Sequence, residues 1–387
     1  KMKDSGIEWI GEIPEGWETI NPKALFAQRK DRASKGERQL TSSQQYGILY
    51  QDEYMELTGS KVVTVEKDFD ILKHVETGDF VISMRSFQGG LEYSTKSGAI
   101  SSAYVMLVPN LELVYPHFYR WLLKSSVYID ALQRTTNMVR DGQAMRYSNF
   151  AQVRLFTLPL DEQKSRADFL DLECSSIDKI LFKTRSSIEE YKKLKQAVIT
   201  QAVTEGTPAM FSSPHSVKLK YLISIVSGEA IRNEQLSDFG EYPVYGGGEI
   251  IGFCSQYNTS EGSLIIGRVG ARCGCVTHTT CKSWATDNAL IVLPTCNAKY
   301  MYYVIGHCQL NNLNTSNAQP LITSTKIKNV VVPYFSDAMQ QQEIADYLDA
   351  KCAKIDGLIA KKEQLVKELE SYKKSLIYEV VTGKREV

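Results

Sequence analysis

The eleven residues DFLDLECSSID at positions 168–178 return as DYLDAKCAKID at positions 346–356, so the second copy begins 178 positions after the first. The match extends without a gap from residues 163–204 onto residues 341–382, with about a third of the positions identical. A repeat of this length indicates a duplicated structural segment, and it has to be recognised before any single motif is interpreted.

Both copies carry the apolar pattern of a coiled coil. Steps of three and four residues alternate along each copy, which is the a/d spacing of a helix that packs on another helix. The pattern comprises Ala167, Leu170, Cys174, Ile177, Leu181, Thr184, Ile188 and Tyr191 in the first copy, and Ala345, Leu348, Cys352, Ile355, Ile359, Lys362, Val366 and Leu369 in the second. Helix starts are marked by Pro159 with Asp161 and by Ser336 with Asp337, and helix ends by Gly206 and Gly383.

Each predicted helix has about 40 residues and a length of roughly 60 Å. Because its apolar stripe is narrow, each helix needs a partner of similar length, and the other copy is the only comparable segment. We therefore expect the two helices to pair antiparallel, with one globular domain at each end of the coiled coil. The alternative is that each helix lies separately along its own domain.

The predicted fold is α+β, with two mixed α/β domains separated by a long antiparallel two-helix coiled coil and related by an approximate two-fold axis. We expect the globular domains at residues 1–158 and 207–335, and the helices at residues 159–206 and 336–387. Short β runs such as FVISM and ALIVL are bounded by turn residues, and residues 117–132 are the best candidate helix within a domain.

Composition narrows the class of protein. The chain has 45 basic and 45 acidic side chains, so any DNA binding depends on local patches or on a partner. No run of 18 apolar residues and no signal-peptide pattern is present, so we expect a cytoplasmic location. Eight irregularly spaced cysteines favour reduced thiols over a disulfide framework.

Several stretches carry a family resemblance. They are GIEWIGEIPEGWE from position 6, YPVYGGGEIIGFCS from 242, GSLIIGRVGARCG from 262 and ATDNALIVLP from 285. Together with the alternation of domain and long repeated helix, they resemble the specificity subunit of type I restriction-modification systems, over essentially the whole chain. The resemblance implies two target recognition domains that each read half of a split DNA sequence. It also implies helices that separate the halves and dock two methyltransferase subunits, with restriction subunits joining through the complex.

Residues for base readout are expected in loops, where Arg, Lys and amide side chains match the hydrogen-bonding edges of the major groove. The candidates are Arg85, Gln88, Lys96, Arg134, Asn137, Arg140, Gln143 and Arg146 in the first domain, and Tyr245, Arg268, Arg272, Lys282, Asn311, Asn312, Asn314, Asn317 and Gln319 in the second. For any one of them, a solvated loop or a turn-stabilising amide is the alternative.

Two further patterns resemble ligand sites. Cys273, Cys275, His278 and Cys281 form C-x-C-x2-H-x2-C, whereas structural zinc sites join two separated pairs, so we expect free thiols and no metal. The triple glycine of YGGGEIIG has neither dinucleotide-binding nor P-loop spacing and suits a tight turn.

Catalytic motifs are missing from the sequence, so we expect a non-catalytic recognition subunit without a cofactor. The main alternative function is that of a structural adaptor, in which the coiled coil holds two protein-binding domains.

Overall fold

The computed structural model describes residues 1–65, 69–83, 91–135, 146–210, 212–270, 272–313 and 321–387. The chain forms two compact units. The first unit comprises Lys1–Lys183 and Leu365–Val387, and the second comprises Thr184–Gln364. Both boundaries fall inside long helices, α6 (Leu160–Glu205) and α9 (Ala338–Val381), so each unit contains one globular domain and a segment of each helix.

The two long helices have 46 and 44 residues. Asp161 and Glu162 place negative charge in the first turn of α6, where it complements the helix dipole. The Asp337 carboxylate accepts hydrogen bonds from the backbone N–H groups of Met339 and Gln340 at 2.7 and 3.1 Å, which satisfies the free donors at the start of α9. Gly206 and Gly383 follow the helices with φ of 89° and 74°, the left-handed conformation typical of a helix end.

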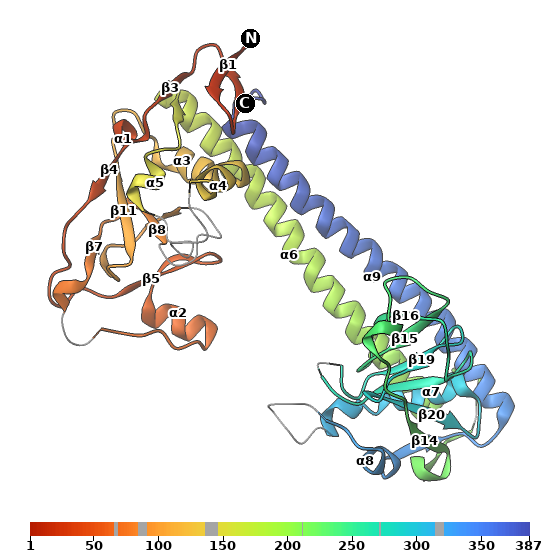
Figure 1. Ribbon diagram of the computed structural model, residues 1–387. Coiled ribbons are helices and arrows are strands. Elements are labelled where there is room, and N and C mark those ends of the chain that lie inside the picture. The colour runs from red at the N-terminus through yellow and green to blue at the C-terminus, as the bar shows by residue number, and fades with distance from the viewer. Residues whose placement is uncertain (66–68, 84–90, 136–145, 211, 271, 314–320) are drawn as a thin grey trace. The chain divides into compact units, whose positions relative to one another are not determined.

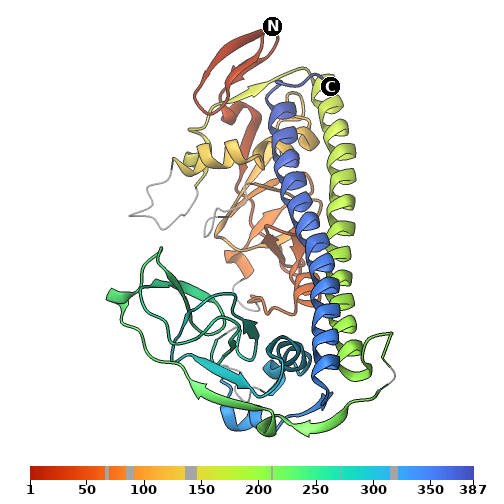
Figure 2. The ribbon, with the colours of Figure 1, turned by 90° about the vertical axis from the view of Figure 1, so that its right-hand side faces the viewer.

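In the first unit, the segments of α6 and α9 pair antiparallel, as predicted (Figures 1 and 2). The early residue Arg166 donates to the carbonyl oxygen of Val380 at 3.0 Å, and Asp178 pairs with Lys373 at 2.6 Å. The predicted seam of α6, with Leu170 and Cys174 among its members, is buried in the same core cluster as Leu376 and Val380.

In the second unit, the same pairing is made by the other copies. Lys195 pairs with Asp356 at 2.7 Å, and Val203 lies in one core cluster with Ala345 and Leu348. Lys195 and Lys373 are 178 positions apart, as are Asp178 and Asp356, so the repeat builds the same interhelical ion pair once in each unit.

The globular domain of the first unit is built on a four-stranded antiparallel sheet of order β4-β11-β8-β9, flanked by two-stranded pairs. Phe26 is central to its core, since the rings of Phe80, Tyr119 and Phe150 meet its ring edge-on at 5.4 to 5.7 Å between centroids. Its elements are β1 (Met2–Ile7), β2 (Gly11–Pro14), β3 (Glu18–Ile20), α1 (Pro22–Leu25), β4 (Phe26–Arg29), β5 (Leu40–Ser43), β6 (Gly47–Tyr50), α2 (Gln51–Thr58), β7 (Lys73–Val75), β8 (Phe80–Ser83), β9 (Glu92–Tyr93), β10 (Gly98–Ile100), β11 (Tyr104–Pro109), α3 (Pro116–Leu123), α4 (Ser126–Gln133), α5 (Tyr147–Phe150) and β12 (Leu155–Thr157).

The globular domain of the second unit repeats this sheet as β14-β20-β17-β18, so in both domains the first strand of the sheet pairs with the last. A three-stranded sheet, β16-β15-β19, is added beside it. The elements are β13 (His215–Lys218), β14 (Ile223–Ser227), β15 (Tyr242–Tyr245), β16 (Ile250–Cys254), β17 (Leu264–Gly267), β18 (Val276–His278), β19 (Trp284–Ala285), β20 (Ala289–Pro294), α7 (Ala298–His307), α8 (Ser324–Lys328) and β21 (Val331–Tyr334). The predicted α+β fold with an antiparallel coiled coil is therefore confirmed.

Two details complete the fold. The helix predicted over residues 117–132 is interrupted, because Ser125 has an extended backbone (φ −67°, ψ 142°) between α3 and α4. Among the described helices, none combines the length and the apolar character needed to cross a membrane.

Candidate nucleic-acid interface

The glycine-rich sequence YGGGE forms the turn between β15 and β16 in the second unit. The backbone N–H of Gly246 donates to the carbonyl oxygen of Glu249 at 2.8 Å, and Gly248 has φ of 112°. A Cβ atom at Gly247 would lie 2.5 Å from the carbonyl oxygen of Val269, so this turn packs directly against the loop that follows β17. The glycines thus act as expected, as a tight turn that permits close backbone approach.

The loop after β17 in turn contacts the asparagine-rich segment. Gly274 donates its N–H to the carbonyl oxygen of Gly267 at 2.8 Å, and a Cβ atom at Gly274 would lie 2.4 Å from the backbone nitrogen of Asn311. Ile322 donates its N–H to the carbonyl oxygen of Arg268 at 3.0 Å. Residues 246–249, 268–270, 272–275 and 310–313 therefore meet, and we call them the loop surface.

Four of the predicted DNA-binding residues lie on the loop surface. Arg268 is partly buried, whereas Arg272, Asn311 and Asn312 are exposed. The guanidinium of Arg272 forms an ion pair with Glu249 at 3.2 Å, and this hydrogen bond raises the pKa of Arg272 above its usual value. Arginine and asparagine side chains can each form two hydrogen bonds with the edge of a base.

Sequence reasoning missed Asn288, which lies beside the loop surface, and Glu249, which lies on it. The carbonyl oxygen of Asn288 accepts a hydrogen bond from the N–H of Arg268 at 3.0 Å, and Asn288 is exposed. The sequence indicated Glu249 only as part of the glycine motif, yet its carboxylate pairs with the guanidinium of Arg272. The stretch ATDNALIVLP contains Asn288, but nothing in its local pattern distinguishes this asparagine from one that only forms a turn.

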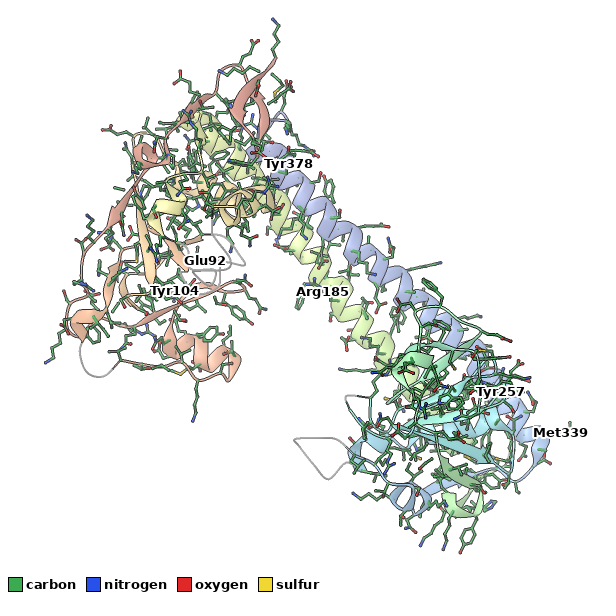
Figure 3. The ribbon with its side chains drawn as sticks, viewed as in Figure 1. Glu92, Tyr104, Arg185, Tyr257, Met339 and Tyr378 are labelled. Atoms are coloured by element: carbon green, nitrogen blue, oxygen red, sulfur yellow. The ribbon has the colours of Figure 1, made fainter. Side chains whose placement is uncertain are left out.

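Two other candidates of the second domain lie elsewhere. Tyr245 is only 9% exposed and packs with Ile265 and Ala285, and burial raises its pKa, so its placement is that of a core residue. The Lys282 ammonium lies 4.4 Å from the ring centroid of Tyr257, whose position among the loops of this domain is labelled in Figure 3. Neither residue belongs to the loop surface.

In the first unit, Lys96 is part of a compact charged cluster. Its ammonium pairs with Glu53 at 2.5 Å and lies 4.6 Å from the ring centroid of Tyr50. The guanidinium of Arg38 lies 3.8 Å from the same centroid and pairs with Asp52 at 2.6 Å. Arg38 and Tyr50 were not among the predicted residues, because only the tertiary fold brings them to Lys96.

Arg134 and Arg146 lie on the described segments before and after residues 136–145. Asn149 donates to the carbonyl oxygen of Thr135 at 2.8 Å, which joins the end of α4 to the start of α5. Arg134 is exposed and lies 3.5 Å from Glu8, and Arg146 is exposed. The remaining candidates lie outside the described residues: Arg85, Gln88, Asn137, Arg140, Gln143, Asn314, Asn317 and Gln319.

A histidine with two carboxylate partners joins two segments of the first domain. The ring nitrogens of His74 lie 2.9 Å from Glu37 and 3.2 Å from Glu76. Burial alone would lower the pKa of His74, but these two bonds outweigh it and raise the pKa. The bonds from Ser97 and His74 lower the pKa of Glu76 to about 2. The doubly protonated imidazolium is therefore the form that satisfies both carboxylates.

The cysteine cluster of the second domain is spread over different environments. Cys273 is buried and its thiol donates to the carbonyl oxygen of Arg268 at 3.2 Å, whereas Cys275 and Cys281 are exposed. Within the described ranges, no three His, Cys, Asp or Glu side chains are gathered as metal ligands.

Comparison with known proteins assigns the second domain. Residues 215–368 match the family model of the type I restriction modification DNA specificity domain. The type I restriction enzyme EcoprrI specificity subunit of Escherichia coli is 29% identical over 110 residues. That match covers 28% of this chain and 27% of the relative, so the chain spans about a quarter of the relative's length.

Solved structures extend the likeness to the fold of the whole chain. A chain from a structure that addresses complex assembly and conformational transition of the type I R-M system has a TM-score of 0.75 at 14% identity, covering 96% of this chain and 99% of its own. The HsdS subunit from Thermoanaerobacter tengcongensis has a TM-score of 0.53 at 14% identity, covering 96% and 98%. The second domain thus matches the type I restriction modification DNA specificity domain, and the chain as a whole shares the fold of these solved structures.

Proposed function

We propose that this chain is the DNA sequence-specificity subunit of a type I restriction-modification complex and reads a bipartite DNA target. In this proposal, residues 1–158 and 207–335 are the target recognition domains, and residues 159–206 and 336–387 are the spacer helices. The chain itself is non-catalytic, takes no cofactor, and works in the cytoplasm with methyltransferase and restriction subunits as partners.

The observation that carries the proposal is the duplication. Each unit has one four-stranded sheet of the same strand order and one segment of each long helix, joined by the same Lys–Asp pair. The loops differ, since the candidate segment is RTTNMVRDGQAMR in the first domain and NNLNTSNAQP in the second. Two domains with the same sheet and helix arrangement but different candidate segments suit a protein that reads two different sequences at a fixed separation.

The loop surface supports base readout by the second domain. Arg272 and Asn311 are exposed on backbone segments that approach each other closely at Gly274. Arginine pairs with guanine and asparagine with adenine through two hydrogen bonds each, worth about 1–3 kcal/mol of discrimination per pair. Because the chain has a net charge of zero, we assign most of the phosphate contacts to the partner subunits.

The long helices offer surface for those partners. On α6 in the first unit, Leu172 and Phe182 are 67% and 74% exposed. Leu194 and Leu358 are exposed on the helix segments of the second unit. Large exposed apolar side chains on a helix favour docking of another protein, and we propose the methyltransferase subunits as the occupants.

The proposal is tested by co-expressing the chain with the methyltransferase encoded beside it and sequencing the methylated sites genome-wide. A split motif with two short specified halves is the expected result. A variant with Arg272→Ala should relax one position of one half. A continuous motif, or methylation that is independent of this chain, would contradict the proposal. Stable complexes with other proteins but no effect on DNA would instead favour the adaptor.

A further inference from the structure

We propose that Asp171 and Asp349 are positioning residues that fix each recognition domain on its helix and thereby determine how sharply each half of the target is read. This inference rests on the proposed function. Each carboxylate is described within its own unit, and the two occupy equivalent places in the repeat, 178 positions apart.

Asp171 on α6 holds the helix α3 of the first domain. Its Oδ1 atom accepts a hydrogen bond from the indole N–H of Trp121 at 2.8 Å and forms an ion pair with Arg120. Both donors come from α3, so a single carboxylate anchors this helix to the coiled coil.

Asp349 on α9 holds the helix α7 of the second domain in the same way. Its Oδ1 atom accepts a hydrogen bond from the Tyr303 hydroxyl at 2.7 Å, and its Oδ2 atom pairs with the ammonium of Lys299 at 2.6 Å. Burial alone would raise the pKa of Asp349, but these two bonds outweigh it and lower the pKa. The carboxylate is therefore charged at neutral pH and binds both donors.

The two anchors are equivalent in position but differ in chemistry. GDFVISM from position 78 aligns with GSLIIGR from 262, and HFYRWLL from 117 aligns with KYMYYVI from 299, which places Trp121 opposite Tyr303. The cation is Arg120 in one unit and Lys299, one turn away from Tyr303, in the other. In each unit the carboxylate thus binds one cation and one N–H or O–H group of an aromatic side chain, although the donor residues differ.

A second contact accompanies each anchor at the start of the long helix. The buried side chain of Gln163 accepts from the backbone N–H of Tyr115 at 2.7 Å, just before α3. The buried side chain of Gln341 accepts from the backbone N–H of Asn297 at 3.1 Å, just before α7. The residue just before each helix is thus held by a glutamine, and the helix itself by the aspartate.

The anchored helices touch the strands that carry the recognition loops. In the second unit, Asp349, Lys299 and His278 line a pocket of about 320 Å³ whose wall also includes Arg272 of the loop surface. In the first unit, Lys124 at the end of α3 pairs with Glu92 of β9 at 2.8 Å. A tilt of α3 or α7 would therefore move the strand beside it and the loop that joins this strand, which matters because displacements near 1 Å weaken directional contacts.

The test uses the complete complex with its methyltransferase subunits. The measured quantity is the methylation rate on the cognate duplex divided by the rate on duplexes with a single base-pair substitution in either half. Arg272→Ala first identifies the half read by the second domain. Asp349→Ala should then lower the ratio about fivefold to tenfold for that half and leave the other half within about twofold, and Asp171→Ala should do the reverse.

The repeat provides matched controls. Asp178→Ala and Asp356→Ala remove carboxylates that pair with lysines of the opposite helix, so they should leave both ratios unchanged. Tyr303→Phe removes the hydroxyl donor and keeps its ring, and Trp121→Phe removes the indole N–H and keeps an aromatic side chain, so each should give a smaller effect of the same kind as the corresponding aspartate variant. Amide hydrogen exchange should rise in α3 for Asp171→Ala and in α7 for Asp349→Ala.

Loss of folded protein lowers the amount of active complex but not the ratio, so the ratio separates positioning from stability. Equal loss at both halves, or no change in either ratio, would overturn the inference and leave the proposed function intact. If the wild-type complex showed no bipartite preference, the proposed function and this inference would both fail.

Discussion

The length of the coiled coil should determine the gap between the two halves of the target. We consider the insertion of one heptad into each helix, a copy of ILFKTRS after Ser186 and a copy of LIAKKEQ after Gln364. In the observed pairing, the sequence numbers of facing residues sum to 551, since Asp178 faces Lys373 and Lys195 faces Asp356. The insertion points satisfy the same sum, 186 + 365 = 551, so both ion pairs and the seam are retained.

The magnitude follows from helix geometry. Seven residues add about 10.5 Å at 1.5 Å per residue, which corresponds to about 3 base pairs at 3.4 Å each. This is an upper limit, because a coiled coil that is inclined to the DNA axis spans less than its own length along that axis. Rotation also matters: each base pair turns the second half by about 34°, whereas a heptad changes the helix phase by only about 20°. We therefore expect the gap to lengthen by one to three base pairs.

The assay is genome-wide sequencing of methylated sites, which reports both the halves and the gap. The two half-sequences should be unchanged, because no recognition domain is altered. A heptad added to α6 alone is the control, and it should abolish modification because one helix then has seven unmatched residues. Persistent methylation with the original gap in the doubly extended protein would refute the reasoning, as would a change in either half-sequence.

Three further perturbations test the domains. Gly267→Ala places a Cβ atom 2.3 Å from the backbone carbonyl oxygen of Gly247 and should lower the methylation rate that depends on one half of the target at least tenfold. Gly306→Ala is the control, because its Cβ atom meets nothing closer than 3.8 Å, and it should leave the methylation rate unchanged. Glu249→Gln releases an exposed ion pair and should strengthen DNA binding by the complex by up to about fivefold at low salt, with a smaller gain at high salt, in filter binding at stated ionic strength. His74→Gln should raise amide exchange in β7 and β10 relative to the wild type. Because the pKa of His74 is raised on folding, the difference in amide exchange between variant and wild type should be full below the ordinary histidine pKa of 6.5 and should disappear as pH rises through the folded pKa. Because the pKa of Glu76 is lowered from 4.5 to about 2, the same difference should decline as pH falls below about 4.5.

The helices could be predicted because their signals are local. The a/d pattern recurs within each copy, and the antiparallel pairing followed from the absence of any other partner of that length. The order of the sheet strands could not be predicted, since the pairing of β4 with β11 joins residues about 80 positions apart and no local pattern encodes it.

The surroundings of the candidate residues could be predicted from the sequence only where the signal is local. The glycine motif indicated a tight turn, and the structure packs this turn against the backbone of Val269 on the loop surface. The burial of Tyr245 was not predicted, because a tyrosine in a strand faces either the core or the solvent, and only the register decides. The environment of Lys96 was missed because Arg38 and Tyr50 reach it through tertiary contacts.

The charges of the repeat explain why the two helices pair head to tail. If the two copies lay parallel and in register, Asp178 would face Asp356 and Lys195 would face Lys373, so like charges would meet twice. In the antiparallel arrangement each aspartate faces a lysine, at 2.6 and 2.7 Å. An exposed pair contributes only about 0–1 kcal/mol, which is small for stability but sufficient, together with the like-charge penalty of the alternative, to favour one orientation. These charges therefore favour the antiparallel over the parallel pairing of the two copies.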